Sequence, residues 1–133
     1  MVSIPAEKTG GKMKSQFEYE SKGDYLIFNI KGRYNRREFL TFPDVIKNRC
    51  EQENIYKVLI NGLSVHGSNL STTDRYFIGE KIGMVLQSRI KLAVVWPEKS
   101  IDKFAETVAL NRGGNMRVLG SFDEAVEWLL ASD

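Results

Sequence analysis

The stretch Ile90-Lys-Leu-Ala-Val-Val-Trp96 is the most apolar segment of the 133-residue chain, and Pro97 follows it directly. Valine, isoleucine and tryptophan favour strands, and a run that is apolar on both faces is typical of a parallel strand covered by helices. We therefore predict a central, buried strand over residues 90–96. Pro97 ends this strand, because proline has no N–H to donate to a neighbouring strand.

Further strands are predicted on both sides of this segment. Residues 57–61 form a second short apolar run of the same kind. Residues 16–21 alternate between polar and apolar, and residues 25–31 follow after a turn at Lys22-Gly23-Asp24, so these two strands form an antiparallel hairpin. The last strand covers residues 116–119.

Helical periodicity and capping residues place helices between these strands. Pro43 is tolerated only near the start of a helix, so we expect an irregular turn from Asn35 and a firm helix over residues 42–53. Ser71 with Asp74 predicts the start of a helix that runs to about residue 87. Two more helices are predicted, one with its apolar face beginning at residue 101 and one opening near residue 121.

The order of these elements is β-β-α-β-α-β-α-β-α, which predicts an α/β fold. An N-terminal antiparallel hairpin is followed by alternating strands and helices, and right-handed crossovers make a mixed sheet with helices packed on it. We expect a single domain over residues 16–133. Residues 1–15 are rich in lysine and glycine and are predicted to be a flexible N-terminal tail.

The composition narrows the classes of function. The net charge is only +2 and the basic residues are scattered among acids, so binding to nucleic acid is not expected. No apolar run is long enough to span a membrane, and no secretory signal is present, so we expect a cytoplasmic protein. Cys50 and His66 are the only residues of their types, which leaves no tetrahedral zinc site, and we expect neither metal nor cofactor.

The C-terminal third resembles a known family. The segments Ile90-Lys-Leu-Ala-Val-Val, Ile101-Asp-Lys-Phe-Ala-Glu-Thr-Val-Ala, Asn111-Arg-Gly-Gly-Asn-Met-Arg-Val and Asp123-Glu-Ala-Val-Glu-Trp-Leu look like those of the bacterial STAS-like group, which is similar to the anti-anti-sigma factors. The resemblance implies a STAS-like fold used as a non-catalytic regulatory module that binds a protein partner. In the anti-anti-sigma relatives a partner kinase phosphorylates a serine at the start of a helix, and Ser68, Ser71 and Thr72 are the counterparts in this sequence.

The segment Gly62–Leu70, predicted to be a polar loop, is the main candidate site. It leaves the C-terminal end of a parallel strand, where open α/β sheets bind ligands, and it leads into a helix N-terminus, which favours an anion. Trp96 is expected to form a wall at the same end of the sheet. The candidate ligand- or partner-binding residues are Ser64, His66, Ser68, Asn69, Ser71, Thr72, Arg75 and Trp96. The alternative is that Ser71 only caps the helix and the loop is an ordinary polar connection.

Two further interpretations stay open. Gly79 and Gly83 lie one helical turn apart, which allows a close approach of their helix to the sheet or, alternatively, forms a contact in a homodimer. The second class of function is a carrier of a small ligand or lipid, with an apolar pocket at the C-terminal ends of the parallel strands. An enzyme is not expected, because the sequence contains no paired carboxylates, nucleophile elbow or dinucleotide fingerprint.

Overall fold

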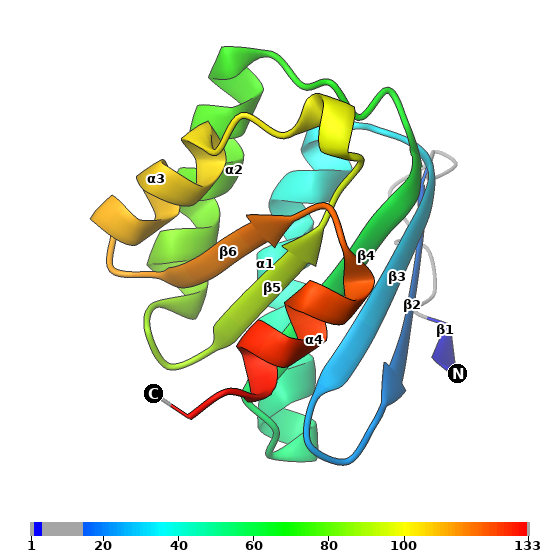
Figure 1. Ribbon diagram of the computed structural model, residues 1–133, viewed down its shortest axis with the longest axis vertical. Coiled ribbons are helices and arrows are strands. Elements are labelled where there is room, and N and C mark those ends of the chain that lie inside the picture. Colours follow the sequence, from blue (N-terminus) through cyan, green and yellow to red (C-terminus); the bar gives the residue numbers. More distant parts are fainter. Residues whose placement is uncertain (1, 4–14, 133) are drawn as a thin grey trace.

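The computed structural model describes residues 2–3 and 15–132, and in this part of the chain a six-stranded sheet has the order β1-β2-β3-β4-β5-β6 (Figure 1). The first three strands are antiparallel neighbours, and β3 to β6 are parallel. This arrangement confirms the α/β prediction. The strands are β1 Val2–Ser3, β2 Ser15–Ser21, β3 Leu26–Arg33, β4 Lys57–His66, β5 Lys91–Val95 and β6 Asn115–Leu119.

The helices form a layer on each face of the sheet (Figure 1). One face carries α1, α2 and α3, and the other carries α4 alone. A short 3-10 helix, η1, lies between β5 and α3. The bounds are α1 Arg36–Glu53, α2 Thr72–Leu86, η1 Glu98–Ser100, α3 Phe104–Asn111 and α4 Phe122–Leu130.

The core follows from the alternation of side chains along the strands. In β4, Val58 and Ile60 point toward α1 and α2, whereas Leu59 points toward α4. All three are buried, which explains why the strand reads as an unbroken apolar run. The predicted buried strand at 90–96 is confirmed as β5, but its predicted central position was wrong, because β5 lies next to the edge strand β6.

The first helix is longer than predicted, because it begins at Arg36 and contains Pro43 in its interior. The Asn35 side chain caps it by accepting a hydrogen bond of 3.0 Å from the Glu38 N–H. Pro43 removes one helical hydrogen bond, but its ring is buried on the same face as Phe39 and Phe42. The burial of apolar side chains therefore stabilises α1 on both sides of Pro43, although proline usually occurs only in the first turn of a helix.

The prediction of a loop from Gly62 was wrong, because β4 continues to His66. Beyond Asn61 the strand pairs only with β3, after a register shift between Asn29 and Lys31. The absence of a side chain at Gly62 makes this path feasible, since a Cβ there would lie 2.4 Å from the Trp96 ring. Ser64 and His66 thus belong to the part of β4 that extends beyond the end of its neighbour β5.

The glycines of α2 lie against α3, and the prediction that they approach the sheet or a second copy was wrong. A Cβ at Gly79 would lie 2.4 Å from the Ala105 carbonyl oxygen, and one at Gly83 would lie 2.7 Å from that of Ala109. These distances leave no room for a side chain, so the backbones of the two helices are in direct contact.

The predicted N-terminal tail is described only in part. Val2 and Ser3 form β1 and pair with Tyr19 and Glu18, so these two residues are in the sheet. Ser15 is buried in β2, and both its N–H and its hydroxyl donate to the Glu38 carboxylate, at 3.0 and 2.7 Å. Backbone pairing and this carboxylate thus order residues for which the sequence shows no apolar signal. Residues 1 and 4–14 lie outside the described part of the chain.

The sheet ends at β6, and side chains from α3 and the turn before it cover part of that edge. The Val118 N–H donates to the Glu106 carboxylate at 2.6 Å. The Val118 carbonyl accepts from the Lys103 ammonium, which also pairs with Glu106 at 3.4 Å. Both outward backbone groups of Val118 are therefore satisfied within the chain.

Candidate functional site

The loop between β4 and α2 is tied to the end of β5. The Trp96 indole Nε1 donates a hydrogen bond of 2.9 Å to the Ser68 backbone oxygen. The Ser68 hydroxyl lies 3.0 Å from the hydroxyl of Ser100, which is buried in η1. Ser68 is therefore held by two contacts, and its hydroxyl is already in a hydrogen bond.

Arg75, in the first turn of α2, connects three segments. Its Nε donates to the Leu70 backbone oxygen at 2.9 Å and one terminal nitrogen donates to the Asn69 side-chain oxygen at 3.1 Å. The Nε also lies 3.1 Å from the Asp102 carboxylate. The side chain is buried, so these partners neutralise its charge. Arg75 thus fixes the loop against the chain between η1 and α3.

The N-terminus of α2 is exposed and carries its own charge arrangement. The Ser71 hydroxyl caps the helix, accepting a hydrogen bond of 3.1 Å from the Asp74 N–H. The Asp74 carboxylate accepts from the Tyr34 hydroxyl at 2.9 Å and lies 3.6 Å from the Arg36 guanidinium. Burial and the Asp74 charge raise the pKa of the Tyr34 phenol, so Tyr34 stays protonated as a donor. Thr72 lies beside Ser71 and is exposed.

Ser64 and His66 are separate from this arrangement. Both are exposed on the extended end of β4, opposite Lys31 and Arg33 of β3. The His66 carbonyl accepts a hydrogen bond of 2.8 Å from the Tyr34 N–H, while its ring makes no hydrogen bond to a described residue. The predicted site therefore consists of a fixed group (Ser68, Asn69, Arg75, Trp96), an exposed cap (Ser71, Thr72) and a strand end (Ser64, His66).

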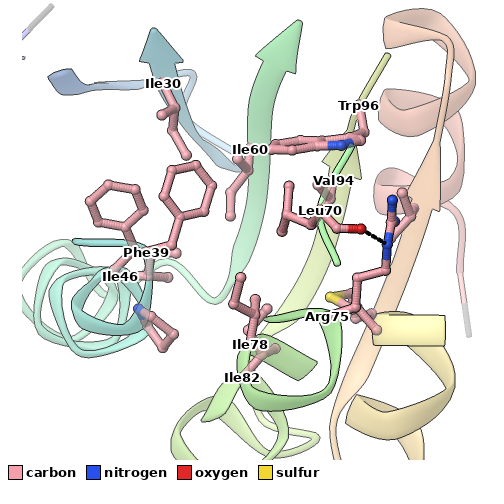
Figure 2. Close-up of a pocket in the computed structure, with 15 residues that line it drawn as sticks. Ile30, Phe39, Ile46, Ile60, Leu70, Arg75, Ile78, Ile82, Val94 and Trp96 are labelled. Carbon is pink, nitrogen blue, oxygen red and sulfur yellow. Dashed lines mark hydrogen bonds between the residues drawn. The ribbon is translucent and has the colours of Figure 1, made fainter. Parts of the chain in front are cut away.

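A cavity of about 100 Å³ lies between the sheet and helices α1 and α2 (Figure 2). Phe39 and Ile46 face it from α1, Ile78 and Ile82 from α2, and Trp96 covers the end nearest the candidate loop. The pocket predicted at the strand ends is thus displaced beneath the helices. The full lining is Ile30, Phe39, Phe42, Pro43, Ile46, Ile60, Leu70, Arg75, Ile78, Ile82, Val94, Trp96, Ala105, Met116 and Val118.

Sequence reasoning missed the partners that complete the site. Ser100 and Asp102 come from the segment after Pro97, and Tyr34 and Arg36 come from the junction of β3 and α1. Their distance in sequence from residues 68–75 concealed these contacts. One signal was available. Because β4 and β5 are parallel, the segments that follow them begin at the same edge of the sheet.

The described residues include no group of three His, Cys, Asp or Glu side chains arranged to hold a metal ion. Within residues 2–3 and 15–132, no helix has the length and apolar character needed to cross a membrane.

Comparison with protein-family models finds no match to this chain, and comparison with curated proteins finds none either. Among solved structures, the chain is similar to the crystal structure of an anti-sigma factor antagonist from Mycobacterium paratuberculosis, with a TM-score of 0.60. The two sequences are 9% identical, and the match covers 88% of this chain and 95% of that chain. At this identity the likeness establishes the fold, which confirms the STAS-like architecture.

Proposed function

We propose that this chain is a non-catalytic regulatory module that binds a protein partner through the exposed start of α2. We define the α2 cap surface as Ser71, Thr72, Asp74 and Arg36. The observation that carries the proposal is the exposed Ser71 hydroxyl at the N-cap of α2, beside one carboxylate and one guanidinium. The fold shared with an anti-sigma factor antagonist supports this class of function, since such an antagonist acts on another protein.

Ser71 is better placed than Ser68 to accept a phosphoryl group. The Ser68 hydroxyl is in contact with Ser100 and its loop is fixed by Trp96, so a kinase would have to break both contacts. Ser71 is exposed and lies at the end of a helix whose dipole favours an anion. Transfer of the γ-phosphoryl group of ATP to the Ser71 oxygen would release ADP and a proton. This requirement for ATP fits a cytoplasmic location.

A phosphate on Ser71 would alter the charge balance of the α2 cap surface. It adds nearly two negative charges close to Asp74, whose carboxylate already holds the Tyr34 hydroxyl and the Arg36 guanidinium. The phosphate would compete with Asp74 for Arg36, because phosphate forms strong charge-assisted hydrogen bonds with arginine. The surface would change from nearly neutral to acidic, which is enough to admit or exclude a partner.

Mass spectrometry of protein isolated from its own cells tests the phosphorylation. Trypsin cleavage after Lys57 and Arg75 releases one peptide that contains every candidate hydroxyl. Fragmentation of this peptide locates the phosphate, and we expect it on Ser71. A phosphate on Ser68 would contradict the assignment, and its absence under all growth conditions would reject the switch.

Affinity enrichment from cell extract tests partner binding. We expect a protein that the unmodified chain retains to be lost with Ser71→Asp. Ser121→Asp is the matched control, because Ser121 caps α4 in the same way, accepting from the Glu124 N–H at 3.3 Å. If both variants lost the partner, the loss would not be specific to Ser71, and this result would contradict partner binding at the α2 cap surface. Light scattering on the purified chain identifies the alternative partner, a second copy of the chain.

A further inference from the structure

The cavity beneath α1 and α2 lies beside the contact between α2 and α3. Gly79 and Gly83 bring the backbone of α2 against α3. The adjoining face of α2 carries Ile78 and Ile82, which point into the cavity (Figure 2), and Ala105 of α3 lines the cavity beside them. The space that the cavity occupies is left unfilled by the side chains of α1, α2, α3 and the sheet.

The exposure of Val94 independently indicates an opening at this place. Val94 lies within β5, between two paired strands, and its side chain points toward the helix layer. Leu92, which points to the same face, is 1% exposed, whereas Val94 is half-buried. Ile78, on the inner side of α2, is also half-buried. Both side chains therefore border the unfilled space of the cavity.

The chemistry of the walls excludes water and charged ligands. The lining is aliphatic and aromatic except for Arg75, which donates to the Leu70 backbone oxygen (Figure 2). The Arg75 guanidinium also contacts Asn69 and Asp102. Among the described residues, no buried side-chain nitrogen or oxygen lacks a hydrogen-bond partner. Water needs two to four polar partners to occupy such a site, and an anion would need a free cation. The cavity thus suits a neutral, apolar occupant.

The size of the cavity limits the occupant further. Apolar cavities of about 150 Å³ lined by leucine, isoleucine and phenylalanine stay dry and bind benzene. This cavity, at about 100 Å³, is smaller, but it is partly open. The Phe39 and Trp96 rings meet edge to face in its lining, with centroids 6.1 Å apart, and offer aromatic surface to a ligand ring.

One ion pair joins α1 and α2 beside the cavity. Lys81 of α2 lies 3.3 Å from the Asp44 carboxylate of α1, and each is adjacent in sequence to a lining residue. Both side chains are substantially exposed, so the pair is weak and can open. Entry between α1 and α2 would have to separate this pair.

We propose that this cavity is a binding site for a small, neutral, apolar molecule containing a single six-membered ring. The site is distinct from the α2 cap surface and does not depend on phosphorylation of Ser71. Arg75 and Leu70 contribute to its wall and are also in the segment that leads from the loop into α2.

Titration of the full chain with benzene tests the site. We expect saturable shifts of the methyl NMR signals of Ile78, Ile82 and Val94, and no shifts around Leu59 on the opposite face of the sheet. At ten times the dissociation constant, benzene is expected to raise the melting temperature by about 5 °C. Benzoate, which adds a carboxylate to the same ring, is expected to bind at least tenfold more weakly.

Variants that fill the cavity supply the control. Val94→Phe places a ring in the cavity and is expected to abolish both responses, and Ile78→Phe serves if the first variant does not fold. Val126→Phe is matched, because Val126 is half-buried on α4 in the other layer. Equal responses of the parent chain and the filled variant would overturn the proposal, as would tighter binding of benzoate than of benzene. Neither result bears on Ser71, so the proposed function is tested separately.

Discussion

The indole nitrogen of Trp96 donates a hydrogen bond of 2.9 Å to the backbone oxygen of Ser68. This contact fixes the loop before α2 to the end of β5. The same ring lies over Gly62, where the extended part of β4 passes. Trp96 therefore orders two segments that separately contribute to the candidate site.

Replacement of Trp96 by phenylalanine is expected to loosen the loop. The variant loses one buried hydrogen bond and part of its packing, which together cost about 1–3 kcal/mol of unfolding free energy. Urea unfolding measures this loss, and amide exchange at residues 67–70 is expected to accelerate. Trp128→Phe is the control, because Trp128 is on α4; equal amide exchange in the two variants would contradict the role of Trp96.

A side chain at Gly62 is expected to be destabilising because of Trp96. Gly62→Ala brings a Cβ to 2.4 Å from the indole ring, and overpacking of this kind costs about 1–3 kcal/mol. The cost is expected to fall substantially in a Trp96→Leu background, where the ring is absent. A double-mutant cycle by urea unfolding measures the coupling. Additive effects would show that Gly62 is required for its backbone alone.

Alanine at Gly79 is expected to destabilise the protein, although alanine is the better helix former. The gain in helix propensity is about 1 kcal/mol, but the new Cβ would lie 2.4 Å from the Ala105 carbonyl, a backbone atom that cannot move away freely. We expect a net loss of about 1–3 kcal/mol in urea unfolding. Thr73→Ala on the exposed side of α2 is the control and is expected to be neutral or slightly stabilising.

Cys50 gives the protein a pH dependence above neutrality. Burial raises the pKa of the Cys50 thiol to about 12, so the folded state keeps its proton where the unfolded chain has lost it. The stabilising effect is complete below the ordinary thiol pKa and is lost as pH rises toward 12. Unfolding free energy is expected to fall by up to about 1.4 kcal/mol per pH unit in that range.

Urea unfolding at several pH values, compared with Cys50→Ala, measures this effect. The alanine variant is expected to show a shallower decline above pH 9. A thiol reagent is expected to label the native chain only as fast as it unfolds. Rapid labelling of the native protein at pH 8 would contradict the burial of the thiol.

The strands and their order were predictable because apolar runs and alternation are local signals. Residues 57–61 and 90–96 could be identified as buried strands from their composition alone. The start of α1 and the end of β4 were not predictable, because both depend on distant residues. Pro43 is retained in α1 by burial against the sheet, and β4 can pass the Trp96 ring because Gly62 has no side chain to collide with it.

The candidate site was predictable at its centre but not at its boundaries. Ser71 and Asp74 form the predicted cap, since capping depends on residues three apart. Arg75 was predicted as a site residue, but its partner Asp102 lies in the segment after η1. The cavity could not be predicted, because side chains from α1, α2, α3 and the sheet, distant from one another in sequence, line it together.

The two edges of the sheet differ in what they offer to other chains. At β6, the backbone groups of Val118 are bonded to Glu106 and Lys103, so another strand cannot pair there without displacing both. Growth of a sheet into an open-ended fibre requires two edges that accept strands. At the β6 edge, growth of this kind would have to break the bonds of Val118 to Glu106 and Lys103.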